Sequence, residues 1–362
     1  MTRGESRNQP VSGPCGEGGV QFEQSRFPEE FVQDGEGGLE YNWLYNFDNS
    51  LIPMSTITSI DKATSNLLQD AVNFFHLGIP LSMEPIIEGL GNRNFLVTTN
   101  SGQFVIKEAL IHTPEEIKLE MIYLDRLLAH NFPAPPYLQG MNGEKIFQKS
   151  SHIIMAQKKF GGKHPEIKPD VCAVLGKWLV KLHKIPCEGL PPRNHWMTPD
   201  FLPRFMASLQ NSHLPYKDQA LASYERLRTL DFNSMPQAII HNDVYRGNLL
   251  FNGLNLIAII DWEESATGAA ILDVASAIVY FCLHEGQIIE RNFRDLLNGY
   301  FTERNFQDVE LINLRNAVQY VSLTNSIWLM VQFGIKTPDE KQLGRGEKYW
   351  KYNLDNLELP KL

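Results

Sequence analysis

Cysteine is scarce in this sequence. The chain has 362 residues and four cysteines, Cys15, Cys172, Cys187 and Cys282. None of them forms a Cys-x-x-Cys pair, so the sequence does not indicate a zinc site or a redox motif, and their scatter does not indicate a disulfide framework. Free thiols are the rule in a reducing cytosol, and we therefore expect a cytoplasmic protein.

Long apolar runs and an excess of positive charge are also missing. The longest apolar run, 269–283, is interrupted by Asp273 and Ser276 and is too short to cross a bilayer, so we expect a buried helix and no membrane contact. No N-terminal stretch resembles a signal peptide. Lys and Arg total 33 against 42 Asp and Glu, a formal net charge of −9. This argues against a nucleic-acid partner, because such binding needs a basic surface.

The remaining composition is that of a globular protein, with 43% hydrophobic and 21% charged residues. Residues 1–53 differ from the rest, because they combine glycine clusters and many acids with little periodicity, and this predicts a disordered tail. Met54 is a candidate for the natural start, while a regulatory tail is the alternative interpretation. We expect an N-terminal lobe at 54–160 and a larger helical C-terminal lobe at 161–362.

Local patterns predict an α+β fold. Apolar residues at helical spacing predict a helix that starts near residue 64 and ends at Gly78, and another over 114–131. A hairpin is predicted for 95–107, with its turn at 100–102, and two further strands are predicted to flank Asn142-Gly143. The pattern after residue 161 is mostly helical. A small antiparallel sheet with one main helix therefore precedes a larger helical part.

The most informative stretch is a second predicted hairpin. The apolar runs 238–240 and 256–260 lead into Asp243 and Asp261, and the turn Asn252-Gly253 lies between them. The midpoint between Asn248 and Asp261 falls inside the turn segment 252–255, so the hairpin brings them roughly level, with Asp243 on the adjoining loop. Two carboxylates and one amide suit a hard cation such as Mg²⁺, with phosphate oxygens completing its shell. This spacing points to phosphoryl transfer.

These residues resemble the catalytic and metal-binding loops of the aminoglycoside phosphotransferase and choline kinase superfamily, in particular its type II homoserine kinases. The likeness covers about residues 64–350 and implies a two-lobed, protein-kinase-like fold. It implies Asp243 as catalytic base, His241 as the residue that braces the loop, and Asn248 and Asp261 as Mg²⁺ ligands. Asp273 matches a structural aspartate of the superfamily.

The resemblance also implies a nucleotide site in the N-terminal lobe. Lys107 ends a predicted strand and matches the lysine that binds ATP phosphates. Glu120 lies at the flank of the apolar stripe of the 114–131 helix, so we expect it to be partly buried and to need a partner; Lys107 is the natural one, and Glu116 is the alternative acid to pair with Lys107. The other implied nucleotide-binding residues are Gly89, Gly91, Asn92 and Asn94 in the phosphate loop, and Gln157 and Lys159 beside the adenine.

We thus expect an enzyme that moves the γ-phosphate of ATP to a hydroxyl of a small molecule, with homoserine or a similar amino alcohol as the first candidate. Choline, ethanolamine or an aminoglycoside is the alternative acceptor, and a non-catalytic nucleotide-binding pseudokinase is the alternative of another class. Two sets of residues bear on the acceptor. Aromatic side chains suited to enclose a quaternary ammonium, or to be core, are Trp262, Tyr280 and Trp328. Arginines suited to a carboxylate are Arg246, Arg291 and Arg294. The sequence does not indicate an oligomeric state.

Overall fold

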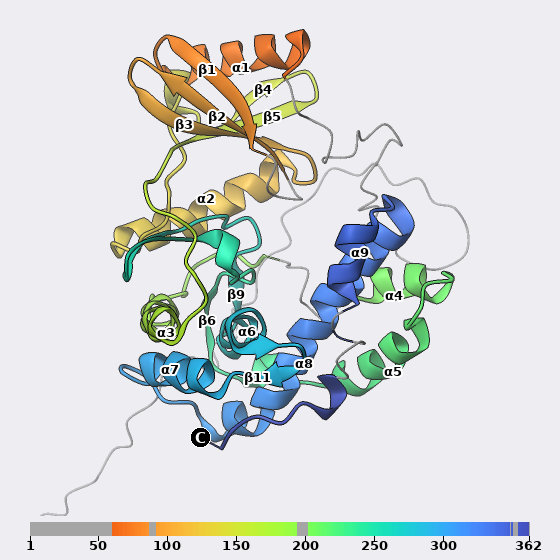
Figure 1. Cartoon of the computed structure of the whole chain (residues 1–362). Coiled ribbons are helices and arrows are strands. Elements are labelled where there is room, and N and C mark those ends of the chain that lie inside the picture. Colours follow the sequence, from red (N-terminus) through yellow and green to blue (C-terminus); the bar gives the residue numbers. More distant parts are fainter. Residues whose placement is uncertain (1–59, 87–91, 194–201, 348, 350–353, 362) are drawn as a thin grey trace, which may run out of the picture. The chain divides into compact units, whose positions relative to one another are not determined.

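The computed structural model of the protein describes residues 60–86, 92–193, 202–347, 349 and 354–361 (Figure 1). The tail predicted for residues 1–53 and the phosphate-loop glycines Gly89 and Gly91 lie outside these described residues. Among the described residues, no helix is both long and apolar enough to cross a membrane.

The first half of the described chain is built on a five-stranded antiparallel sheet with the order β1-β2-β3-β5-β4. Its elements are α1 (Lys62–Phe74), β1 (Pro80–Ile86), β2 (Asn92–Thr99), β3 (Gly102–Ala109), α2 (Pro114–Ala129), β4 (Phe147–Lys149) and β5 (His152–Lys158). The Asp61 carboxylate caps α1 by accepting the Thr64 N–H at 2.7 Å. The buried side of α1 packs against apolar residues of the sheet, such as Phe95 and Ile106.

The strands predicted on either side of Asn142-Gly143 are wrong in position. Those two residues belong to the 3₁₀ turn η2 (Met141–Gly143), in which Asn142 has φ 61°. The β4–β5 hairpin turns instead after Lys149, where Ser150 has φ 54°. Asn-Gly suits any turn that needs positive φ, so the dipeptide alone did not distinguish a hairpin from a helical turn.

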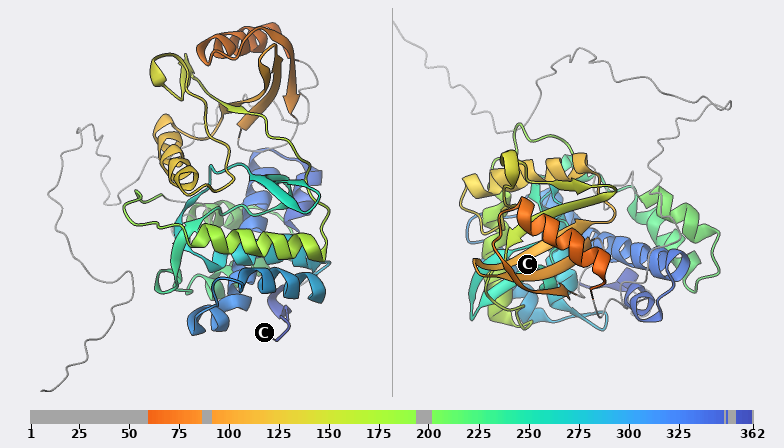
Figure 2. Two further views of the ribbon diagram at one scale, coloured as in Figure 1. Left: turned by 90° about the vertical axis from the view of Figure 1, so that its left-hand side faces the viewer. Right: turned by 90° about the horizontal axis from the view of Figure 1, so that it is seen from above.

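The second half is mostly helical. Its helices are α3 (Pro169–His183), α4 (Leu202–Gln210), α5 (Lys217–Leu227), α6 (Ile271–Ala277), α7 (Glu290–Tyr300), α8 (Asp308–Val331) and α9 (Glu340–Gly346). Its strands are β6 (Gln237–Ile240), β7 (Leu249–Asn252), β8 (Asn255–Ile259), β9 (Ala266–Ala269), β10 (Leu283–His284) and β11 (Gln287–Ile288). α3 and α7 lie side by side (Figure 2). The α+β fold class predicted from the sequence is confirmed.

The close packing of α3 on α7 depends on two glycines. A side-chain carbon added at Gly176 of α3 would lie 2.0 Å from the Leu296 carbonyl oxygen, and one added at Gly299 of α7 would lie 2.1 Å from the Ala173 carbonyl oxygen. Only glycine permits this approach of the two backbones. It brings His183, at the end of α3, against Tyr300, at the end of α7.

Candidate active site

The predicted hairpin exists and brings the predicted metal ligands level. β7 pairs with β8 in the register Leu249 to Ile259, and Gly253 supplies the positive φ of 60° that the turn requires. At the open end of the hairpin, the Ile260 N–H donates to the Asn248 carbonyl at 2.9 Å. Asp261 follows directly, with φ 68°.

Asp243 and Asn248 contact each other on the adjoining loop. The Asn248 Nδ2 donates to both the backbone carbonyl and the Oδ2 of Asp243, each at 2.9 Å. This leaves the amide oxygen of Asn248, the atom that a hard cation binds. Burial and then repulsion by Asp261 raise the pKa of the Asp243 carboxyl to about 7. Asp243, Asn248 and Asp261 are thus gathered at one end of the hairpin.

His241 connects the two sides of this loop. Its ring is fully buried; the Asp243 N–H donates to Nδ1 at 3.2 Å, so Nε2 carries the proton that is donated to the Ile260 carbonyl at 2.9 Å. Burial lowers the pKa of the His241 imidazole. His241 therefore lies where a bracing histidine was predicted.

Asp273 binds the backbone of the loop that leads to Asp243. Its two carboxylate oxygens accept the backbone N–H groups of His241 and Asn242, each at 2.8 Å. Asn242 has φ 66°, a left-handed conformation that needs support from its surroundings. Asp273 therefore fixes His241 and Asn242, the two residues before Asp243, and through them the position of Asp243.

Lys107 connects the sheet to this loop, but not as predicted. Its Nζ lies 2.5 Å from Asp261 Oδ1 and 4.0 Å from Glu263 Oε2, and neither Glu120 nor Glu116 pairs with it. Burial opposes the charge of the Lys107 ammonium, but Asp261 together with the other acidic groups around it outweighs burial, and the pKa of Lys107 is well above its ordinary value. Glu116 instead forms the capping box of α2 with Thr113.

Glu120 is buried, as predicted, but its partner is a tyrosine. The Tyr137 hydroxyl donates to Glu120 Oε1 at 2.9 Å. Burial raises the pKa of the Glu120 carboxyl from an ordinary value of 4.5 to about 7, although Lys107 acts in the opposite direction. The predicted burial of Glu120 is therefore confirmed, whereas the predicted partner, Lys107, is wrong.

This raised pKa predicts a pH-dependent stability. Because the folded-state pKa lies above the unfolded one, the contribution of Glu120 is fully present below pH 4.5 and is lost as the pH rises to about 7. We expect Glu120→Gln to match the wild type near pH 5 and to unfold with a free energy up to about 3 kcal/mol higher at pH 8. Urea unfolding at both pH values measures this.

Glu115→Gln is the matched control, because Glu115 is exposed on the same helix. The free energy of unfolding of Glu115→Gln should differ from that of the wild type by the same amount at both pH values. An equal difference at both pH values for Glu120→Gln would contradict the prediction.

The predicted nucleotide-loop residues are only partly described. The Asn92 amide is buried and donates to the Glu263 carboxylate, and Asn94 pairs in register with Lys107. In β5, the Gln157 side chain donates to the Pro135 carbonyl. The Lys159 N–H donates to the Gln103 carbonyl at 3.0 Å, so a backbone contact with adenine would use other groups of this segment.

Four residues that sequence reasoning did not assign also line the site. Glu263 and Glu264 follow Asp261 by two and three positions, and His112 Nε2 lies 3.9 Å from Glu263 Oε2 and 4.0 Å from Glu264 Oε1. Arg193 donates to the carbonyls of Glu263 and Ser265, each at 2.6 Å, and fixes this loop. The acidic Glu263-Glu264 pair so close to Asp261 was the signal that could have identified this part of the site.

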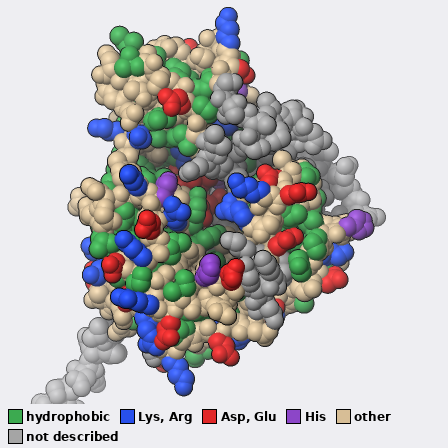
Figure 3. Space-filling model, viewed as in Figure 1, with side chains coloured by type: hydrophobic (Ala, Val, Ile, Leu, Met, Phe, Trp, Pro, Cys, Tyr) green, Lys and Arg blue, Asp and Glu red, His purple; other side chains and the backbone are tan. Residues whose placement is uncertain are grey.

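The site holds more acidic than basic side chains. Burial and then Asp261 raise the pKa of the Glu263 carboxyl, and burial and then Glu263 raise the pKa of the Glu264 carboxyl to about 8. Figure 3 shows acidic side chains in a hollow with Lys and Arg side chains beside it. This crowding of carboxylates suits a divalent cation. Within the described part of the chain, no group of three His, Cys, Asp or Glu could hold a metal, so a cation here would need the Asn248 amide and phosphate oxygens.

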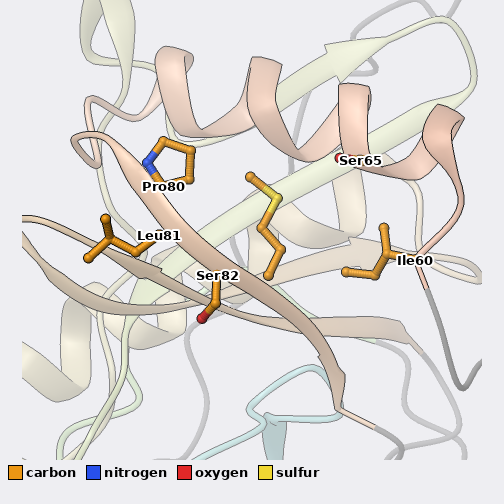
Figure 4. A pocket seen from close by; sticks show the side chains of 6 residues that line it. Ile60, Ser65, Pro80, Leu81 and Ser82 are labelled. Carbon is orange, nitrogen blue, oxygen red and sulfur yellow. The ribbon is translucent and has the colours of Figure 1, made fainter.

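A separate pocket of about 340 Å³ lies beside α1 and β1 (Figure 4). Its described lining contains none of the predicted site residues; it consists of Ile60, Ser65, Pro80, Leu81, Ser82 and Met83. No titratable side chain is among these described residues, so they offer no group for acid–base chemistry.

The aromatic residues proposed as a cage do not share one environment. Trp262 is only 1% exposed and packs between Phe132 and His241, which makes it core. Tyr280 lies against Tyr245, whereas Trp328 lies against Phe333. The prediction that Trp262, Tyr280 and Trp328 form one aromatic cage is therefore wrong.

Two of the three arginines proposed for a carboxylate lie against acids of their own helix. Arg291 faces Asp295 and Arg294 pairs with Glu290, all on α7. Arg345, on α9, instead lies close enough to Asp243 to act against the rise of its pKa. It was not predicted, because it is about one hundred positions away in the sequence.

The comparisons with known proteins agree with this geometry. A family model described as the phosphotransferase enzyme family matches residues 82–306. The homoserine kinase of Pseudomonas aeruginosa strain PAO1 is 26% identical over 276 residues, which cover 71% of this chain and 82% of that protein.

Solved structures give the fold. A microcompartment-associated aminopropanol kinase superposes with a TM-score of 0.63 at 17% identity, over 80% of this chain and 95% of that one. An amicoumacin kinase, solved with AMP-PNP, Ca²⁺ and its ligand, superposes with a TM-score of 0.62 at 14% identity, over 81% and 94%. The chain therefore has the two-lobed, protein-kinase-like fold that the sequence predicted.

Proposed function

The chain belongs to the phosphotransferase enzyme family, and from this we propose that it transfers the γ-phosphate of ATP to the hydroxyl of a small amino alcohol, with homoserine as the first candidate. The observation that carries the proposal is the gathering of Asp243, Asn248 and Asp261 at the end of one hairpin, with Lys107 of the sheet bound to Asp261. Phosphoryl transfer needs this set: a base, metal ligands and a cation for the phosphates.

The roles follow from the positions. Asp243 orients the acceptor hydroxyl and takes its proton as the hydroxyl oxygen bonds to the γ-phosphorus and the bond to the β–γ bridging oxygen breaks, so that ADP leaves. When ATP binds, the Lys107 ammonium leaves the Asp261 carboxylate and donates to phosphate oxygens instead. Asn248 and Asp261 would hold Mg²⁺, which supplies charge neutralisation at the β- and γ-phosphates. Positioning and electrostatics provide most of the acceleration.

The surroundings of Asp243 favour an acceptor that carries a carboxylate. The Arg345 guanidinium lies near enough to lower the pKa values of both Asp243 and Tyr280 against the effect of burial. A guanidinium near the catalytic aspartate matches the carboxylate of a hydroxy-amino acid. Homoserine has this group, whereas choline and ethanolamine have no carboxylate.

An acceptor panel tests the proposal. The purified chain is incubated with MgATP and homoserine, hydroxylysine, choline, ethanolamine or an aminoglycoside, and ADP release and phosphorylated product are measured. We expect acceptor-dependent ADP release that is fastest with homoserine or hydroxylysine. ATP binding without acceptor-dependent turnover on any of them would identify a nucleotide-binding pseudokinase instead.

Arg345 gives a sharper prediction about specificity. We expect Arg345→Gln to raise the KM for homoserine about tenfold, the effect of losing about 1.4 kcal/mol from a charge-assisted contact. The KM for 3-aminopropan-1-ol, which is homoserine without its carboxylate, should not change. Steady-state kinetics with both acceptors measures this.

Arg291→Gln is the matched control, because Arg291 is exposed on α7 and its nearest acid is Asp295. It should leave both KM values unchanged. An equal effect of Arg345→Gln on both acceptors would exclude recognition of a carboxylate by Arg345.

A further inference from the structure

A buried series of hydrogen bonds leads from the end of α7 to the loop that carries Asp243. His183, the last residue of α3, has its Nε2 3.3 Å from Asp273 Oδ2 and its Nδ1 2.8 Å from the Tyr300 hydroxyl. The side chains of His183 and Asp273 are fully buried. The oxygen that His183 contacts is also the one that accepts the His241 backbone N–H.

The partners of Tyr300 determine the direction of these hydrogen bonds. Arg304 NH1 lies 2.8 Å from the Tyr300 oxygen, and a guanidinium only donates, so this oxygen accepts. The Tyr300 proton is then free for His183 Nδ1, which places the other imidazole proton on Nε2, facing Asp273. Each hydrogen-bond donor in the series thereby faces an acceptor.

The far end of the series is anchored. Arg304 NH2 donates to both carboxylate oxygens of Glu310, at 2.8 and 2.7 Å, and the Glu310 side chain is fully buried at the start of α8. Glu310 also accepts the Gln307 N–H at 2.9 Å. Arg304 therefore has a fixed position from which to orient Tyr300.

We propose that His183 is a positioning residue for phosphoryl transfer: oriented by Tyr300, its Nε2–H holds the Asp273 carboxylate, and Asp273 holds the backbone that places Asp243. This inference rests on the proposed function for its effect on turnover. Without the His183 donor, the Asp273 carboxylate can rotate in its buried site, and the left-handed Asn242 loses its fixed support. A small displacement of a catalytic group lowers the rate while nucleotide binding by Lys107 is unaffected.

Two substitutions of His183 separate positioning from packing. His183→Leu fills the space without a donor, whereas the amide nitrogen of His183→Gln reaches about the position of Nε2 and donates. We expect His183→Leu to lower kcat about tenfold with the KM for ATP within twofold of the wild type, and His183→Gln to regain most of kcat. If His183→Leu does not fold, Tyr300→Phe, which keeps the ring, is expected to lower kcat about threefold with the same unchanged KM for ATP.

Hydrogen exchange of the His241 and Asn242 backbone amides tests the same inference without turnover. We expect faster exchange at both amides in His183→Leu and wild-type exchange in His183→Gln. Phe306→Leu is the matched control, because its ring lies 5.5 Å from that of Tyr300 but takes no part in these hydrogen bonds. It should lower stability and leave kcat and the two exchange rates unchanged.

Wild-type kcat and wild-type exchange in His183→Leu, or in Tyr300→Phe if only that variant folds, would overturn the inference. So would an equal loss of kcat in Phe306→Leu. If the wild type transfers no phosphate to any acceptor, the proposed function fails, and the exchange rates alone decide whether His183 positions the loop.

Discussion

Replacing Asp243 with Asn is expected to lower kcat about 10³-fold, within the range that a positioned general base contributes. The amide cannot accept the proton of the acceptor hydroxyl, although its oxygen can still accept the Asn248 Nδ2–H that Asp243 Oδ2 accepts now. The loop geometry therefore survives, and we expect the Kd for MgATP to change less than threefold. Stopped-flow kinetics and calorimetric titration with MgATP measure the two quantities.

Thermal unfolding separates this effect from misfolding. Burial and Asp261 raise the pKa of the Asp243 carboxyl to about 7, so its ionised form is unfavourable at pH 8 and the Asn variant should be at least as stable as the wild type. Asp218→Asn, at an exposed position of α5, is the control and should keep full activity. Wild-type turnover in Asp243→Asn would remove this residue from the mechanism.

Replacing Lys107 with Met is expected to lower kcat/KM for ATP by about 10²- to 10³-fold, mainly through a higher KM. Methionine retains the apolar stem of a side chain that is 6% exposed, so the sheet should keep its packing. The ammonium that lies 2.5 Å from Asp261 is lost, and no other cation of β3 replaces it at the phosphates. Initial rates at varied ATP concentration measure the change.

Lys149→Met is the control for this substitution. Lys149 lies on the edge strand β4 of the same sheet, is about half exposed and pairs with Asp70 on the surface. We expect its kinetics to equal those of the wild type. An unchanged KM for ATP in Lys107→Met would place the triphosphate elsewhere than between the sheet and the Asp261 loop.

Contacts between residues that lie close together along the chain were readable from the sequence. Asp243, Asn248 and Asp261 lie within nineteen consecutive positions, and one turn with a glycine at positive φ is sufficient to bring two of them level. The burial of Glu120 was readable from the apolar stripe of its helix. Its partner was not, because Tyr137 reaches it only after the segment that follows α2 has folded back along β5.

The amino-acid sequence by itself determined the fold class, the hairpin and the residues at its open end, because turns and periodicities are set by neighbouring positions. The tertiary structure decided the partners. It joined Lys107 to Asp261 across 154 positions, buried Trp262 in the core, and aligned His183, Tyr300 and Asp273 behind the loop. These contacts depend on how whole elements pack, and packing distances are not encoded in the spacing of residues along a single segment.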